Sequence, residues 1–304
     1  MLAFLFPGQG SLRPGMGAPW VDTASWAVIG RLSDVLGRDL ASLLVEADAA
    51  TLQSTRNAQA ATFALSLVAL DRVRANGISA GAVAGHSLGE YTALVAAGAL
   101  AETAAMTLVG ERGEAMQAAA DERAGTMAAV LGAQPDEVSL ACAEVEGAWV
   151  ANDNAPGQIV VAGSIEGVAA IEPVAKAHGA SRVMALAVGG AFHSPLMQPA
   201  QVRLDRALAQ AAFTASSVPV VTNVDGRAHT DGGWRELLSA QLCQQVRWRE
   251  SLLALAGLGA TTFVEIGPGD ALSGMVKRTI EGAARHSVAT PDSADVLAAA
   301  LAGS

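Results

Sequence analysis

The sequence predicts an α/β fold in which a parallel-sheet core is interrupted by a smaller inserted domain. Apolar runs that stop at glycine alternate with alanine-rich helical stretches in the first third of the chain. Between residues 124 and 188 the pattern changes to the order β-α-β-β-α-β, which is typical of a ferredoxin-like unit. We therefore expect an α/β core at 1–123 and 189–304 around an inserted ferredoxin-like subdomain at 124–188. With 304 residues, 51% of them hydrophobic, such a core needs no disulfides.

Short apolar runs and the residues that stop them define the core elements. Leu2 begins a buried strand that ends before Pro7 and Gly8, and a second strand ends at Gly85, before a helix of small residues. A strand, a sharp turn and a helix in so few residues indicate a βα unit of a parallel sheet. The predicted core comprises strands at 2–6, 82–84, 218–223 and 262–266 and helices at 58–73 and 91–97, with at most a helix in the tail at 289–304.

The inserted stretch combines short apolar runs with two helical patterns. One helix is expected to start at Pro135, and the second pattern is amphipathic. A turn at Asn154-Ala155-Pro156-Gly157 separates the two middle strands. The predicted order is a strand at 126–131, a helix at 135–142, strands at 149–152 and 158–162, a helix at 165–178 and a strand at 182–188.

Charge and composition exclude several classes of function. The 19 basic and 29 acidic residues give a formal charge of −10, which argues against nucleic acid as a partner, because phosphate binding requires a basic face. No apolar run reaches the roughly 18 residues of a membrane span, and the apolar start has no positively charged segment before it. Cys142 and Cys243 lack metal-ligand spacing and are expected to be reduced packing residues. We expect a cytoplasmic protein with no membrane partner.

The segment Gly85-His86-Ser87-Leu88-Gly89 has the G-x-S-x-G spacing of a nucleophile elbow. In such an elbow the serine occupies a strained turn between a strand and a helix, which exposes its hydroxyl. Glycines flank it because side chains there would clash with the tight backbone. The N–H groups at the start of the following helix can stabilise an oxyanion. The pattern therefore predicts that Ser87 is a nucleophile.

A serine nucleophile requires a base, and His193 is the best placed of five histidines. It lies where the chain returns from the inserted domain, on a segment that can face the cleft between the domains. A structural role for this histidine is equally open from the residues alone. No aspartate stands out as its partner: Asp205 and Asp225 are candidates by position only, and a main-chain carbonyl near Gln241 is the alternative.

Ordered motifs along nearly the whole chain resemble the family of malonyl-CoA:acyl carrier protein transacylases and the acyltransferase domains of polyketide synthases. This resemblance implies a hydrolase-like α/β core with the inserted ferredoxin-like subdomain. The motifs are Phe6-Pro7-Gly8-Gln9-Gly10-Ser11, Asn57-Ala58-Gln59, Gly85-His86-Ser87-Leu88-Gly89-Glu90-Tyr91, Arg112-Gly113 with Met116, Gly125-Thr126-Met127, Asn152 to Gln158, Ala191-Phe192-His193-Ser194, Gln241-Leu242, Val246-Arg247-Trp248 and Glu265 to Gly269.

The resemblance assigns catalytic roles to five residues. It implies that Ser87 is the nucleophile and His193 the base. It also implies that the main-chain N–H groups of Gln9 and Leu88 form the oxyanion hole, and that the Gln241 carbonyl orients the histidine.

Four further residues are implied to contact the substrate. Arg112 would bind the free carboxylate of a malonyl group, since a guanidinium offers it two parallel donors. From the residues alone, the favoured interpretation of Arg112 is an exposed helix arginine paired with Glu111 or Glu114. Phe192, before the base, would favour malonyl over methylmalonyl, and His86 and Met116 are expected beside it. Leu12 stands where the family usually has a second glutamine.

The expected enzyme is a malonyl-CoA:ACP S-malonyltransferase that acts through a malonyl-serine intermediate, with no metal and no redox cofactor. Its expected partners are malonyl-CoA and an acyl carrier protein, in fatty acid or polyketide biosynthesis. Carrier proteins are acidic, so docking would need local cations, for which Lys176, Arg182, Lys277 and Arg278 are candidates. The alternatives are a hydrolase that clears acyl carrier proteins, the malonyl-transfer component of malonate decarboxylase, and a non-catalytic carrier-binding module.

Overall fold

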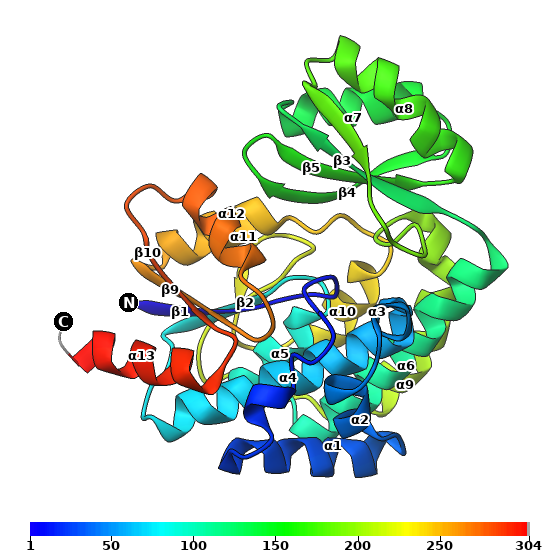
Figure 1. Ribbon diagram of the computed structural model, residues 1–304. Helices are drawn as coiled ribbons and strands as arrows, with labels where there is room; N and C mark the ends of the chain where they lie inside the picture. Colours follow the sequence, from blue (N-terminus) through cyan, green and yellow to red (C-terminus); the bar gives the residue numbers. More distant parts are fainter. Residues whose placement is uncertain (303–304) are drawn as a thin grey trace.

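Two separate sheets organise the chain in the computed structural model, which describes residues 1–302 (Figure 1). The larger sheet has six strands in the order β10-β9-β1-β2-β7-β8, and the smaller has four in the order β4-β5-β3-β6. The strands of the larger sheet are β1 (Leu2–Phe6), β2 (Ala82–Gly85), β7 (Val220–Val221), β8 (Ala228–His229), β9 (Thr262–Ile266) and β10 (Ala284–Val288). Those of the smaller sheet are β3 (Thr126–Leu131), β4 (Ala148–Ala155), β5 (Gln158–Gly163) and β6 (Arg182–Ala185).

Thirteen α-helices and three short 3₁₀ helices accompany the sheets within residues 1–302. The 3₁₀ helices are η1 (Ala18–Trp20), η2 (Ala24–Trp26) and η3 (Pro195–Met197). The α-helices are α1 (Ala27–Leu36), α2 (Leu40–Val45), α3 (Ala49–Gln53), α4 (Thr55–Ala75), α5 (Gly89–Ala96), α6 (Glu102–Glu122), α7 (Pro135–Glu144), α8 (Ile165–Ala177), α9 (Gln198–Gln210), α10 (Trp234–Gln241), α11 (Trp248–Gly257), α12 (Ala271–Thr279) and α13 (Pro291–Ala302). No helix among these is long and apolar enough to cross a bilayer.

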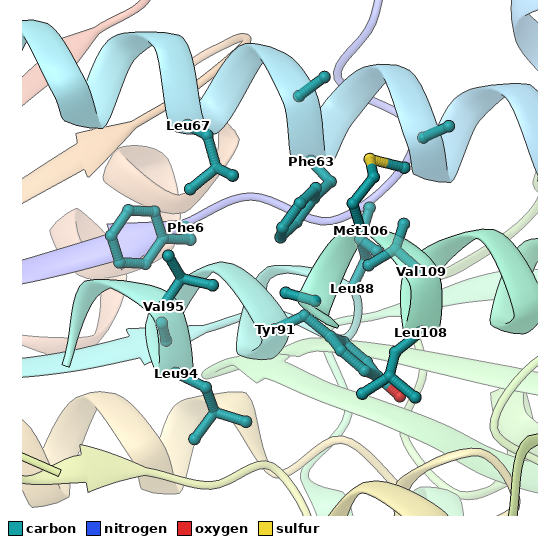
Figure 2. Packing of buried hydrophobic residues seen from close by; sticks show 14 of the residues in the cluster. Phe6, Phe63, Leu67, Leu88, Tyr91, Leu94, Val95, Met106, Leu108 and Val109 are labelled. Carbon is teal, nitrogen blue, oxygen red and sulfur yellow. The ribbon is translucent and has the colours of Figure 1, made fainter. Parts of the chain in front are cut away.

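The larger sheet is parallel except for β8, and its central strand β1 is buried between helices on both faces. Successive side chains of a strand point to opposite faces, so Phe4 and Phe6 enter one apolar cluster while Ala3 and Leu5 enter another. The first cluster includes residues of α4, α5 and α6, and Figure 2 shows Phe6 near Leu67 of α4 and Val95 of α5. Burial on both faces explains why β1 is a continuous apolar run rather than an alternating one.

The smaller sheet is antiparallel and has two different faces. On one face Ala128 and Val130 pack with α7 and α8 in a separate apolar cluster. On the other face Met127 and Val160 belong to the cluster of the larger domain. This second face is therefore turned toward the larger domain, and its side chains are available to a site between the sheets.

Strand β4 is tied directly to the segment before α11. Asn152 and Val246 form a parallel bridge, in which the Asp153 N–H donates to the Val246 carbonyl (2.9 Å) and the Val246 N–H donates to the Ala151 carbonyl (2.8 Å). The buried Asp153 carboxylate also pairs with Arg249 of α11 at 2.9 Å. These bonds hold β4, and with it the smaller sheet, against the segment of the larger domain that precedes α11.

The predicted fold class is confirmed, and so is the order of elements in the inserted stretch, whose sheet spans 126–185. The division at 124 and 188 stays a prediction. The predicted turn at 154–157 is too long, because β4 continues through Asn154 and Ala155 as a buried strand. Two strands, β8 and β10, were not predicted. Both are short, polar edge strands whose hydropathy resembles that of a loop, so only their pairing to β7 and β9 defines them.

Candidate active site

Ser87 occupies the turn between β2 and α5 in a left-handed backbone conformation, with φ +52°. Such a conformation is costly for a residue with a Cβ atom and marks a turn held by its surroundings. A Cβ atom on Gly85 would lie 1.9 Å from the Gly89 carbonyl, and one on Gly89 would lie 2.1 Å from the Phe6 carbonyl oxygen. Both glycines are therefore required by the close approach of β1, β2 and α5.

His193 faces Ser87, with its Nε2 atom 2.7 Å from the serine Oγ. Its Nδ1 atom lies 2.8 Å from the main-chain carbonyl oxygen of Gln241. Since a carbonyl can only accept, Nδ1 carries the proton and Nε2 is free to accept the serine hydroxyl proton. His193 also has a positive φ, +58°, and within residues 1–302 it and Ser87 are the only residues other than glycine that do.

The carbonyl alternative to a carboxylate is therefore the one observed. Asp205 is exposed on α9, and Asp225 pairs with His229 at 2.9 Å, so neither contacts His193. Burial lowers the pKa of His193 to about 3, and the positive charge of Arg112 acts in the same direction. The imidazole is thus neutral at physiological pH, as a general base must be.

Arg112 of α6 lies beside the same hydroxyl and is almost fully buried (1% exposed). Its Nη2 atom donates to Ser87 Oγ and to Gln241 Oε1, both at 3.0 Å, and its Nη1 atom donates to Gln59 Oε1 at 2.7 Å. The guanidinium carbon also lies 5.7 Å from the centre of the Tyr91 ring. Burial lowers the pKa of this guanidinium.

The interpretation of Arg112 as an exposed helix arginine is wrong. Its glutamate neighbours pair elsewhere, Glu111 with Arg203 and Glu114 with Arg56. The hydroxyl of Ser87 accepts from Arg112, so its single proton is directed at His193. A positive charge at this distance favours the anionic form of the serine oxygen.

A cavity of about 170 Å³ opens in front of the serine, between the two sheets. The smaller sheet supplies Met127, Asn152, Asn154 and Val160, and the segment that follows β6 supplies Leu186 and Val188. The remaining lining residues are Gly8, Gln9, His86, Ser87, Met116, Phe192 and His193. An apolar pocket with a few convergent polar groups is typical of a substrate site.

Of the predicted site residues, Ser87, His193, Gln9, His86, Met116 and Phe192 line this cavity. Arg112, Gln241 and Leu88 lie directly behind it, buried against Ser87. Among the described residues, the main-chain N–H groups of Gln9 and Leu88 donate to no protein acceptor. Two main-chain N–H groups without an acceptor, one on a residue that lines the cavity and one on the residue that follows the serine, are the kind of donors that an oxyanion hole requires.

His86 links the two sheets beside the cavity. Its Nε2 atom lies 2.9 Å from Asn154 Oδ1 of β4, and its ring meets the edge of Trp248 at a centroid distance of 5.3 Å. Burial lowers the pKa of this imidazole. These contacts join the turn after β2 to the smaller sheet, and the His86 ring also lines the cavity.

A second cavity of about 380 Å³ adjoins the first. Gln9, Val188 and Phe192 line both, so these three side chains form the wall between them. This second cavity is otherwise lined by the loop after β1, by α3 and α4, and by residues 187–189 of the segment that follows β6.

Sequence reasoning missed three polar residues around the serine: Gln59, Glu90 and Asn223. Gln59 accepts from Arg112, Asn223 Oδ1 accepts from the Ser87 N–H (2.6 Å), and Glu90 accepts from Gln241. Two of them carried a signal in the sequence, because Gln59 and Glu90 belong to the motifs that resemble the transacylase family. Asn223 carried none, since its position follows from the packing of β7 beside β2.

Comparison with known proteins gives consistent similarities. Residues 3–303 match the family described as acyl transferase domain. The chain is 40% identical over 302 residues to a malonyl CoA-acyl carrier protein transacylase of Bacillus subtilis (strain 168), covering 97% of this chain and 95% of that one. It also resembles a solved acyl-carrier-protein S-malonyltransferase of Burkholderia pseudomallei 1710b, with a TM-score of 0.93, 38% identity and coverage of 98% and 99%.

A further solved structure holds a type II PKS acyl-carrier protein in complex with its malonyl-transacylase. This chain resembles it with a TM-score of 0.94 and 35% identity, covering 98% of this chain and 99% of that one.

The strain at Ser87 predicts an order of stability between two variants. Ser87→Gly and Ser87→Ala both remove the hydroxyl, but only glycine adopts a positive φ without cost. We expect Ser87→Gly to be more stable than Ser87→Ala by about 1 kcal/mol in urea unfolding followed by circular dichroism. Equal stabilities would show that the turn is not strained.

Proposed function

Since this chain belongs to the acyl transferase domain family, together with the malonyl-CoA:acyl carrier protein transacylases, we propose that it transfers malonyl groups from malonyl-CoA to an acyl carrier protein. One observation carries the proposal beyond acyl transfer in general: the buried guanidinium of Arg112 lies 3.0 Å from the nucleophile. A neutral acyl group has no use for a buried cation at that place, whereas the free carboxylate of a malonyl group is its natural partner.

The proposed reaction has two steps. Ser87 Oγ attacks the malonyl thioester carbon while His193 Nε2 takes the hydroxyl proton. The N–H groups of Gln9 and Leu88 hold the developing oxyanion, and the Gln241 carbonyl stabilises the protonated ring through Nδ1. The C–S bond then breaks and His193 returns its proton to the departing CoA thiolate.

The second step repeats the first with a different nucleophile. The phosphopantetheine thiol of the carrier protein gives its proton to His193, and its sulfur attacks the malonyl-serine ester. When the C–O bond breaks, the proton returns to Ser87 Oγ and malonyl-carrier protein leaves. Exchange of an acyl group between sulfur and oxygen changes no oxidation state, and we propose that no metal and no redox cofactor takes part.

Phe192 would limit the donor to unbranched malonyl groups. It is 4% exposed and forms part of the wall between the two cavities, so its ring occupies space that a methyl branch beside the serine would need. His86 and Met116 would complete the contacts of the acyl group. We place the reaction in the cytoplasm, where malonyl-CoA and carrier proteins are found, in fatty acid or polyketide biosynthesis.

A carrier-protein hydrolase is the competing function, and Arg112 argues against it, because an editing hydrolase needs no carboxylate clamp. The malonyl-transfer component of malonate decarboxylase, which shares the fold, stays an alternative setting for the same transfer. A non-catalytic module would have no reason to keep Ser87, His193 and Arg112 in contact.

We propose that the carrier protein docks on a cation patch formed by Arg182, Lys277 and Arg278. Arg278 Nη1 donates to Gln158 Oε1 at 3.2 Å, which joins α12 to the smaller sheet. Gln158 of β5 and Arg182 of β6 both pair with Leu131 of the strand between them, so Arg182 lies two strands from Gln158 at the same end of the smaller sheet. An acidic carrier protein is complementary to this patch although the chain as a whole is acidic.

A mass measurement tests the transfer directly. We expect malonyl-CoA to add one malonyl group to the intact protein and carrier protein to remove it as malonyl-carrier. Ser87→Ala should lose acylation by at least about 10³-fold. Release of free malonate in place of carrier loading would identify a hydrolase, and an unmodified wild-type protein would contradict both functions.

Removal of the guanidinium should change donor selectivity. We expect Arg112→Ala to reduce malonyl transfer roughly 100-fold more than acetyl transfer, because two charge-assisted hydrogen bonds are lost with malonyl alone. Arg112→Lys is the matched control, which keeps the charge and loses the planar pair of donors. Rates of acyl-enzyme formation from acetyl-CoA and malonyl-CoA measure it, and an equal loss for both donors would refute the clamp.

Charge reversal on the cation patch should affect the carrier step alone. We expect Lys277→Glu/Arg278→Glu to raise the KM for carrier protein by about tenfold at low salt, with less effect at high salt, while acylation by malonyl-CoA is unchanged. Lys176→Glu is the matched control, since Lys176 already pairs with Glu172 at 2.7 Å within α8. An unchanged KM in the double variant would place the docking surface elsewhere.

A further inference from the structure

Glu90 is a buried carboxyl group that the proposed reaction does not use. It lies three residues after the nucleophile, in the first turn of α5, and is 1% exposed. An isolated acid so deeply buried is costly unless its oxygens are hydrogen-bonded. The contacts of Glu90 therefore indicate what keeps it there.

One contact leads to the nucleophile. Glu90 Oε2 accepts from the main-chain N–H of Asn223 at 2.9 Å. The Asn223 side chain in turn spans the elbow: its Nδ2 atom donates to the Gly85 carbonyl at 2.7 Å, and its Oδ1 atom accepts from the Ser87 N–H at 2.6 Å. Glu90 thus fixes the residue that holds both sides of the strained turn.

A second contact leads to the base. The same Oε2 atom accepts from Gln241 Nε2 at 3.0 Å. Gln241 is the residue whose main-chain carbonyl accepts from His193 and whose side chain also contacts the Ser87 carbonyl and Arg112. One oxygen atom therefore joins the supports of the nucleophile and of the base.

We propose that Glu90 is a positioning residue of the transfer reaction, which fixes Ser87 through Asn223 and His193 through Gln241. The inference rests on the proposed function, because it names how the Ser87–His193 pair of that function is aligned. A displacement of about 1 Å in such a pair is sufficient to cost roughly 100-fold in rate. Loss of both Oε2 contacts would produce such a displacement without removing any group that touches the substrate.

The charge of Glu90 adds a signature in the pH profile. Burial raises the pKa of this carboxyl group to about 7, against the opposing effects of the Asn223 and Gln241 hydrogen bonds and of the Arg112 charge. The charge of Asp225 also raises the pKa of Glu90. Tyr91, the next residue of α5, faces Arg112 of α6, and burial raises the pKa of its hydroxyl group. Because the pKa of His193 is near 3, this base does not titrate near neutrality.

The ionised carboxylate is the stronger acceptor, since charge-assisted hydrogen bonds are shorter and stronger than neutral ones. The rate of serine acylation should therefore rise as Glu90 loses its proton, with a midpoint near pH 7. A midpoint in that range would ordinarily be assigned to the catalytic histidine. Here it belongs to a group that never contacts the substrate.

Two variants separate the hydrogen bonds from the charge. Glu90→Gln can place its amide oxygen at the Oε2 position and keep both bonds without ionising. Glu90→Leu loses both bonds. Single-turnover acylation of the full chain is measured from pH 5.5 to 8.5 with malonyl-N-acetylcysteamine and acetyl-N-acetylcysteamine, which lack the titrating phosphate of CoA, and thermal unfolding is followed in parallel.

We expect the wild-type rate to rise about fivefold across this range. Glu90→Gln should be flat, at the level of the wild-type protein at low pH. Glu90→Leu should be about 100-fold slower than the wild-type protein at pH 8, equally for both donors, because the nucleophile and base serve both. The acylation rate should thus fall from wild type to Glu90→Gln to Glu90→Leu. The conservative Gln variant would keep most of the rate that the Leu variant loses, which a change in folding stability alone would not produce.

Two results would overturn the inference: a Glu90→Leu rate within threefold of wild type, or a pH limb near 7 that persists in Glu90→Gln. If Glu90→Leu does not fold, the pH profile of Glu90→Gln decides alone. Failure of the proposed function would look different, since the wild-type protein would then form no malonyl-serine ester at any pH.

Discussion

The positive charge of Arg112, buried beside the hydroxyl of Ser87, is the constraint on which the rest of the site depends. A guanidinium out of water requires partners for its N–H groups and compensation for its charge. Gln59, Gln241 and the serine itself accept from it, and its Nε atom has no acceptor among the described residues. The hydrogen-bonding capacity of this cation is therefore not exhausted by the protein, which supports the proposed role of Arg112 in binding a carboxylate.

Burial and the Arg112 charge together set the protonation states of the neighbouring groups. Burial lowers the pKa of His193 and the Arg112 charge acts in the same direction, whereas burial raises the pKa of Glu90 and the Arg112 charge opposes it. The acid and the base have pKa values far apart because both are buried, since burial disfavours the charged form of each and so raises the pKa of the acid and lowers that of the base. Such divergence of neighbouring titratable groups is typical of catalytic sites, since it assigns each group one protonation state over the working range.

Strain and support occur together in this site. Ser87 and His193 adopt the only positive φ values outside glycine within residues 1–302, and each costs on the order of 1–3 kcal/mol. Both are held from behind by buried polar residues rather than by packing alone. Gln241 contacts Ser87, His193, Arg112 and Glu90, so it joins segments that are up to 154 residues apart in sequence.

The sequence by itself determined the fold class, the order of elements in the inserted sheet and the position of the elbow. These follow from local pattern: apolar runs, glycine stops and the clearance that Gly85 and Gly89 provide. Only the tertiary structure decided between the alternatives that the sequence left open. It showed that a main-chain carbonyl, and not Asp225, accepts from His193, and that Arg112 is buried rather than exposed. Those choices depend on contacts between distant segments, and β10, Asn223 and Glu90 gain their roles only through such pairing. A local pattern specifies an element, whereas a hydrogen bond across 150 residues exists only after the elements have packed.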